Sequence, residues 1–139
     1  MSTSARIRRA VVSSESLAVV RAFCDAVTPP LDLLDQDVVW MGTRGGLDQD
    51  RVLRGREAFV EYLAEITDLW ERFEADAERF IETGHAVVVF FHETGRARHA
   101  DLEVQSDTAA VFKVRQGKIV EVRGYLDREE ALEAARLTK

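Results

Sequence analysis

The sequence contains few of the residues that interrupt or cross-link a chain. It has two prolines, which are adjacent at Pro29-Pro30, and one cysteine, Cys24. A single cysteine excludes an internal disulfide, and free thiols persist in a reducing compartment, so we expect a cytoplasmic protein. No apolar run approaches the ~18 residues that a membrane-spanning helix needs. Arg6–Arg9 is followed by only three apolar residues before serines, so no signal peptide is visible. We therefore expect no membrane partner.

Basic residues are also in deficit. Lysine and arginine number 19 against 25 aspartates and glutamates, which gives a formal net charge of −6. Binding to nucleic-acid phosphates requires a basic field, so the composition argues against a nucleic-acid partner. Gly45-Gly46 does not lie between a strand and a helix as a phosphate-binding loop would, and no dinucleotide fingerprint is present. We therefore expect no cofactor.

The 139 residues, of which 46% are hydrophobic, fit one domain over 1–139 with a loose N-terminal lead-in at 1–12. Apolar residues at helical spacing predict a helix from Glu15 to Val27, capped by Ser13 or Ser14 and stopped by the proline pair. A helical turn is expected at residues 31–34. A strand should follow at 37–41, and a second helix opens at Gly55 with an apolar face that reaches Trp70.

The second half of the chain predicts mainly strands. The expected strands cover residues 73–78, 87–91, 107–114 and 119–126, with turns at Thr83-Gly84, at 94–96 and at Gln116-Gly117. Asp127 should cap a final helix over 128–137. Early helices followed by a long antiparallel meander indicate an α+β domain.

Several segments resemble one known family when taken in order along the chain. They are Val38-Val39-Trp40, Gly55-Arg56-Glu57-Ala58-Phe59, residues 83–89, Gly95-Arg96, residues 116–120 and residues 125–134. This order resembles the SnoaL-like proteins of the nuclear transport factor 2-like, or cystatin-like cone, superfamily. The resemblance implies a curved antiparallel sheet wrapped around N-terminal helices, a cone-shaped pocket and a C-terminal helix. It implies no single activity, because the family holds ketosteroid isomerases, polyketide cyclases, epoxide hydrolases, dehydratases and non-catalytic dimerisation modules.

A two-residue turn at Gln116-Gly117 would place Val111 opposite Val122 and Ala109 opposite Gly124, and the resemblance turns that face inward. Such a cavity would suit a flat, apolar small molecule. The alternative is a core filled by side chains. The expected lining residues are Phe23, Trp40, Tyr62, Val89, Phe91, Ala109, Val122 and Gly124.

The opposite face would then mix aliphatic side chains with a tyrosine and a charge pair, which suits a homodimer interface. The alternative is a solvated face. The residues expected there are Ala110, Phe112, Val114, Ile119, Glu121, Arg123 and Tyr125.

The resemblance also allows known reactions to be tested. A ketosteroid isomerase needs a carboxylate base and an oxyanion hole of Tyr and protonated Asp. The matching positions hold Gly42, Phe23, and Ala109 or Ala110, so all three groups are missing. The Arg-x-Asp pair of limonene-type epoxide hydrolases is absent from the sheet region.

What remains is a polyketide-cyclase-like scheme in which one residue moves a proton on an enolisable ligand. Asp107 shares the parity of Ala109, and burial beside aromatics would raise its pKa. The alternative is a solvated aspartate at the start of the strand, at the rim of the cavity. Glu93 also has inward parity, but the turn expected at 94–96 predicts that it is exposed. His99 is the other candidate, as a proton shuttle at the cavity mouth.

A turn at 94–96 would also place His92 opposite His99, but two histidines on a hairpin are usually surface residues, so we expect no metal site. Cys24 lies on the buried stripe of the first helix and is expected to be a core residue. The sequence therefore predicts an apolar small-molecule pocket with cofactor-free isomerase-like or cyclase-like chemistry. The alternative is a non-catalytic binding or dimerisation module of the same fold.

Overall fold

The computed structural model describes residues 15–84 and 86–137. Its helical elements are a first helix at residues 15–25, a 3-10 turn η1 (Leu31–Leu33), α2 (Arg56–Leu69) and α3 (Arg128–Leu137). Its strands are β1 (Leu34–Arg44), β2 (Val52–Arg54), β3 (Trp70–Thr83), β4 (Ala86–Ala97), β5 (Glu103–Arg115) and β6 (Lys118–Tyr125). No helix in this described part is long and apolar enough to span a membrane.

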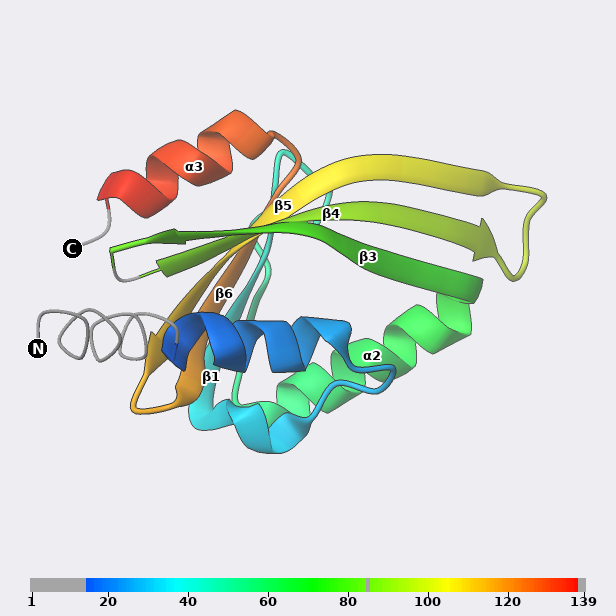
Figure 1. Cartoon of the computed structure of the whole chain (residues 1–139). Coiled ribbons are helices and arrows are strands. Elements are labelled where there is room, and N and C mark those ends of the chain that lie inside the picture. The colour runs from blue at the N-terminus through cyan, green and yellow to red at the C-terminus, as the bar shows by residue number, and fades with distance from the viewer. Residues whose placement is uncertain (1–14, 85, 138–139) are drawn as a thin grey trace, which may run out of the picture.

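The six strands form one curved sheet in the order β2-β1-β6-β5-β4-β3 (Figure 1). β1 runs parallel to β6, whereas every other neighbouring pair is antiparallel. The α+β class, the curved sheet, the early helices and the C-terminal helix are therefore confirmed. The sheet is mixed rather than purely antiparallel, because the chain passes from β2 through α2 to the far edge before it returns to pair with β1.

Helices cover both faces of the sheet (Figure 1). On the inner face, the first helix and α2 bury Val20, Phe23 and Phe59 against strand residues that include Val89 and Phe112. On the outer face, α3 packs through small residues. The outer cluster consists of Ala86, Val88, Ala109, Val111, Tyr125, Ala131 and Ala135. The inner face is the one that holds the larger aromatic side chains.

The local signals for helix ends largely hold. Gly55 precedes α2 with a positive φ of 87°, a conformation that favours glycine. The Asp127 carboxylate accepts hydrogen bonds from the backbone N–H groups of Glu129 (2.9 Å) and Glu130 (3.4 Å), which confirms the predicted cap of α3. The first helix ends at residue 25, and Val27 is fully exposed rather than part of the buried stripe. The expected lead-in at 1–12 and the Ser13 or Ser14 cap lie outside the described residues.

The strands of the meander are longer than predicted, and the turn expected at 94–96 is wrong. Gly95 is a buried residue inside β4, paired with Phe73 of β3 and Val104 of β5. A Cβ on Gly95 would lie 3.0 Å from Cε3 of Trp70, so the glycine marks a close approach of this indole rather than a turn. The connection to β5 falls instead at residues 98–102.

The predicted register between β5 and β6 is shifted by one residue. The hairpin begins as expected, with Arg115 opposite Lys118, but the pairing then steps from Val114–Ile119 to Lys113–Glu121. Val120 is therefore an extra residue on β6, a β-bulge that brings Phe112 opposite Val122. A one-residue slip exchanges the two faces of a strand. As a result Ala110 and Phe112 face the inner layer, while Ala109 and Val111 face α3.

This slip also changes the face expected to form a dimer. Ala110, Phe112 and Ile119 lie in the inner core, and Tyr125 is covered by α3. The face proposed as an interface from the sequence therefore does not exist as one surface. Homodimerisation through the outer sheet face stays a prediction.

Candidate functional site

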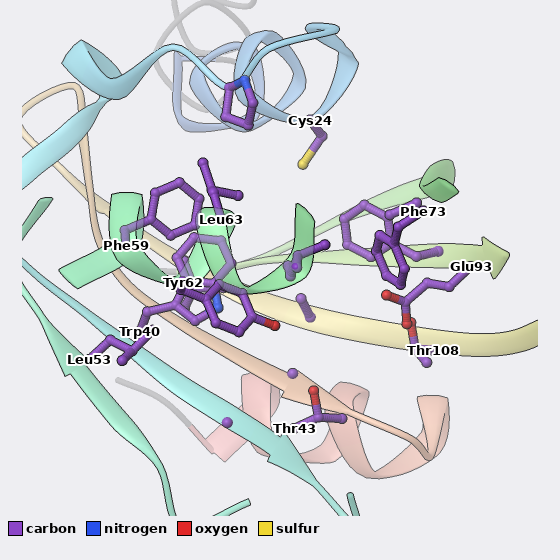
Figure 2. Close-up of a pocket in the computed structure, with 18 of the residues that line it drawn as sticks. Cys24, Trp40, Thr43, Leu53, Phe59, Tyr62, Leu63, Phe73, Glu93 and Thr108 are labelled. Carbon is purple, nitrogen blue, oxygen red and sulfur yellow. The ribbon is translucent and has the colours of Figure 1, made fainter. Parts of the chain in front are cut away.

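A cavity of about 500 Å³ lies between the inner face of the sheet, the first helix and α2 (Figure 2). This volume falls within the range of ~300–1,000 Å³ that is typical of small-molecule sites. The two helices contribute Phe23, Phe59 and Tyr62, and the sheet contributes Trp40 and Phe91. Ala110 and Gly124 also border the cavity, and Gly124 leaves room for the Thr43 side chain, because a Cβ there would lie 2.7 Å from Thr43 Oγ1.

One end of the cavity is a wall of aromatic rings. The ring centroids of Trp40 and Phe59 are 4.5 Å apart, and Phe23 lies 6.1 Å from each of them. Phe112 meets Trp40 edge to face at 6.4 Å and 89°. Aromatic pairs favour such tilted and edge-on geometries, so these rings hold one another in place. They give the cavity a firm apolar surface.

The opposite side of the cavity carries a half-buried carboxylate. Glu93 lies on the inner face of β4, and its Oε1 accepts a 2.8 Å hydrogen bond from the Thr108 hydroxyl of β5. Figure 2 shows the two side chains pointing toward each other at the edge of the cavity. Burial raises the pKa of Glu93, the Thr108 hydrogen bond partly opposes this, and the nearby Asp48 charge adds to the rise. The hydrogen bond occupies Oε1 and leaves Oε2 for a ligand.

Tyr62 adds a hydroxyl to the same space. It is placed by α2, where Phe59, Tyr62, Leu63 and Ile66 share one face at helical spacing. Burial raises the pKa of Tyr62, and the charges of Asp48 and Glu93 raise it further against the opposing charge of Arg51, so its hydroxyl stays protonated. In Figure 2 the hydroxyl points into the cavity. Tyr62 can thus donate a hydrogen bond beside Glu93.

The loop between β1 and β2 closes one side of the cavity and carries Asp48 and Arg51 to it. Its backbone folds back on itself, since Gly42 N–H donates to the Arg51 carbonyl (2.8 Å) and Arg51 N–H donates to the Asp48 carbonyl (2.9 Å). The Arg51 guanidinium donates two hydrogen bonds to Glu65, of 3.2 and 2.5 Å, and lies 5.7 Å from the centroid of the Tyr62 ring.

Cys24 borders the cavity from the first helix. Burial raises the pKa of its thiol to about 12, and the charge of Asp25 adds to this. A thiol with such a pKa stays protonated near neutral pH, which makes it a poor nucleophile. Cys24 packs against the inner core cluster, in line with the structural role expected for it.

The structure brings most of the predicted lining residues together around the cavity. Those that border it are Phe23, Trp40, Tyr62, Phe91, Ala109, Val122 and Gly124. Val89 is fully buried in the inner core and is absent from the lining. Ala109 borders the cavity, but it packs with Ala131 and Ala135 in the outer cluster.

The expectation that Asp107 faces the cavity is wrong. The bulge at Val120 turns Asp107 to the outer face, where its side chain is 64% exposed and its Oδ1 lies 2.7 Å from His92 Nδ1. The hydrogen bond with His92 lowers the pKa of Asp107, and the charge of Arg128 lowers it further despite some desolvation. This is the opposite of the raised pKa expected from burial among aromatic side chains.

His99 lies in the exposed connection between β4 and β5 and does not line the cavity. It is not opposite His92, whose partners across the sheet are Asp76 and Asp107. Among the residues that the structure describes, no group of three His, Cys, Asp or Glu side chains could hold a metal ion.

The position matched to the ketosteroid isomerase base has no room for a side chain. A Cβ on Gly42 would lie 1.7 Å from the Asp48 carbonyl oxygen. The loop backbone fills the space that a carboxylate would need there, and Asp48 borders the cavity from the same loop.

The polar groups of the cavity differ in how far the sequence pattern predicts them. Glu93 shares the parity of Val89 and Phe91, which was a usable signal, but the turn expected beside it led to its exclusion. Thr108 was missed because the β5 register was shifted. Asp48 and Arg51 lie in a loop without periodicity, so no pattern pointed to them.

Three solved structures share this fold at low sequence identity. An NTF2-like protein of unknown function from Burkholderia pseudomallei is 20% identical over 86% of this chain and 96% of its own, with a TM-score of 0.69. A SnoaL-like polyketide cyclase candidate from Jannaschia sp. CCS1 is 16% identical over 91% and 94% of the two chains, with a TM-score of 0.68. An LEH-like epoxide hydrolase from M. tuberculosis is 23% identical over 88% and 90%, with a TM-score of 0.64.

At these identities the likeness shows the fold and not the reaction. Comparison with curated protein sequences found no match. The SnoaL-like domain family, however, matches residues 20–122, which cover most of the sheet, α2 and the second half of the first helix. The chain therefore belongs to the SnoaL-like family.

Proposed function

We propose that the cavity binds an apolar small molecule with an enolisable carbonyl group and that Glu93 moves a proton on it without a cofactor. The observation that carries this proposal is the half-buried Glu93 carboxylate, held by Thr108 at the edge of an aromatic cavity. Family members include cyclases and isomerases that act on such ligands, and the Jannaschia relative is a polyketide cyclase candidate.

In this proposal Glu93 transfers the proton and Tyr62 stabilises the charge that develops on the ligand. Glu93 Oε2, which Thr108 leaves available, takes the proton from the carbon next to the ligand carbonyl, and the C–H electron pair moves into the enolate. Tyr62 keeps its proton and donates a hydrogen bond to the carbonyl oxygen, where negative charge develops. Protonated Glu93 then returns the proton to carbon, at the same or a conjugated position. A carboxyl whose pKa is raised toward the working pH suits both steps.

The alternative is a binding module that retains a ligand without chemistry. The specific observation in its favour is that the three positions of the ketosteroid isomerase set hold Gly42, Phe23 and Ala110 or Ala109, none of which can transfer a proton.

Proton exchange on a model ketone tests the proposal directly. β-Tetralone is bicyclic, apolar and enolisable, and proton NMR in D2O follows loss of its α-protons. We expect the protein to accelerate this exchange above the buffer rate. Glu93→Gln should lower the acceleration by about 10²–10⁴-fold, the usual contribution of a positioned acid–base group.

Asp107→Asn is the matched control, because it removes a carboxylate from the outer face of the same sheet. It should leave the exchange rate unchanged. Saturable binding of β-tetralone without faster exchange would favour the binding module. Equal loss of exchange in Asp107→Asn and Glu93→Gln would contradict the assignment of Glu93.

A further inference from the structure

The side chains that line the cavity carry an excess of negative charge. Asp48 and Glu93 are acidic, and Arg51 is the single cationic side chain among the described lining residues. Asp48 acts electrostatically on both Tyr62 and Glu93, so its charge is felt inside the cavity. Charges that line a cleft with low-dielectric walls are felt more strongly than charges on an open surface.

Arg51 already forms an ion pair with another residue. Its guanidinium donates two hydrogen bonds to Glu65, which does not line the cavity, and its side chain is 41% exposed. A carboxylate ligand that sought Arg51 would have to displace Glu65 from this paired geometry. Arg51 is therefore poorly placed to attract an anion into the cavity.

The C-terminal end of the first helix adds a partial negative charge beside the cavity. The first helix ends at residue 25, and Ala26 and Val27, which follow it directly, border the cavity. The last carbonyl groups of a helix carry a partial negative charge, because the peptide dipoles align along its axis. This end of the helix disfavours an anion at the cavity mouth.

We propose that the cavity selects its ligands by charge, accepting neutral and cationic apolar molecules and excluding carboxylates, and that Asp48 is a specificity-determining residue for this selection. The inference rests on the proposed ligand-binding function of the same cavity. Asp48 is the residue to test because it lies on the loop between β1 and β2, apart from the Glu93–Thr108 pair. Its substitution changes the charge of the cavity without removing the proposed proton carrier.

Three probes of one shape test this selection. Naphthylmethylamine is a cation at neutral pH, naphthylmethanol is neutral and naphthoate is an anion. Isothermal titration calorimetry on the full chain should give affinities in the order amine, alcohol, carboxylate. Asp48→Asn should raise the affinity of naphthoate relative to the alcohol by about tenfold, which corresponds to about 1.4 kcal/mol.

Asp50→Asn is the matched control. It removes the same charge from the same loop, and Asp50 does not line the cavity. It should leave the carboxylate-to-alcohol ratio unchanged, whereas Asp48→Glu should preserve the exclusion. Added salt should also bring the affinities of naphthoate and the alcohol for the wild-type protein closer together, because salt screens the repulsion between the carboxylate and the cavity. This measurement needs no variant.

The inference would be overturned if naphthoate bound the wild type as tightly as the alcohol. Equal effects of Asp48→Asn and Asp50→Asn would overturn it as well, because net charge alone would then explain the preference. If none of the three probes bound, the ligand-binding cavity itself would be refuted together with its selectivity. Binding without charge preference, by contrast, would refute only the selectivity.

Discussion

Thr108 and Glu93 are diagonal neighbours across the β4–β5 pair, and the Thr108 hydroxyl donates a 2.8 Å hydrogen bond to Glu93 Oε1. Thr108 is only 6% exposed, so little water is at hand to replace its hydroxyl. This bond opposes the rise in the pKa of Glu93 that burial causes. The pair therefore tunes the proposed proton carrier.

Thr108→Val should raise the pKa of Glu93 further, because valine keeps the side-chain shape but removes the donor that favours the ionised carboxylate. Loss of the bond should also cost about 1 kcal/mol of stability. The carboxyl carbon shift of Glu93, followed by NMR against pH, measures the change. Thr108→Ser keeps the hydroxyl and should stay close to the wild-type value. A Glu93 pKa that fell in Thr108→Val would contradict the role of this bond.

Burial of Glu93 also makes stability depend on pH. The folded-state pKa of Glu93 lies above its ordinary value of 4.5, so between these two values the folded chain binds more protons than the unfolded chain. The contribution of Glu93 to stability is thus full below pH 4.5 and falls as pH rises through the folded-state pKa.

Glu93→Gln should remove this dependence, because glutamine does not titrate. In urea unfolding across a pH series, the wild type should lose stability relative to Glu93→Gln as pH rises above 4.5. A difference between the two proteins that stayed constant with pH would count against an ionisable Glu93 whose pKa the fold raises.

His92 and Asp107 form a separate pair on the outer face. The hydrogen bond with Asp107 raises the pKa of His92, and the same bond lowers the pKa of Asp107. The stabilisation from His92 is complete below pH 6.5 and is lost as pH rises through its folded-state pKa. That from Asp107 is complete above pH 3.8 and is lost as pH falls through its folded-state pKa. The pair is thus most effective between these limits.

Asp107→Asn should return the pKa of His92 toward 6.5, which NMR titration of the imidazole protons would show. Ligand binding and proton exchange in the cavity should not change, because the pair lies on the other face of the sheet. Loss of ligand binding in this variant, with the fold intact by circular dichroism, would instead support a link between the two faces.

Periodicity was sufficient to predict the elements that position the cavity. The apolar spacing of Phe59, Tyr62 and Leu63 located α2 and its inward face. The continuous apolar run 87–91 located β4, and the resemblance to the SnoaL-like proteins put Val89 and Phe91 on its inner face. In both cases the pattern extends over several residues of one continuous element. Such a signal survives errors at the ends of the element.

The register of β5 and the end of β4 depended on single residues that carry no periodic signal. The bulge at Val120 lies inside the run 119–122, whose side-chain pattern fits a regular strand equally well. This bulge nevertheless decides which face of β5 meets the cavity. The sequence predicts a turn at Gly95, and its tight contact with Trp70, which keeps the residue inside β4, exists only in the folded chain. These two positions account for the preference for Asp107 over Glu93.

Neighbouring alanines of β5 provide the sharpest test of this register. Ala110 lies in the inner core and borders the cavity, whereas Ala109 packs against Ala131 and Ala135 of α3. A larger side chain at Ala110 has a cavity to enter, but one at Ala109 meets a helix that is already in close contact.

Ala110→Leu should therefore fold with little loss of stability and bind naphthylmethanol much more weakly. Ala109→Leu should lose about 1–3 kcal/mol through overpacking against α3. Urea unfolding and calorimetry on both variants measure the two effects. If the effects were exchanged, so that Ala109→Leu blocked binding while Ala110→Leu mainly lost stability, β5 would have the unbulged register, and Asp107 would face the cavity in place of Thr108.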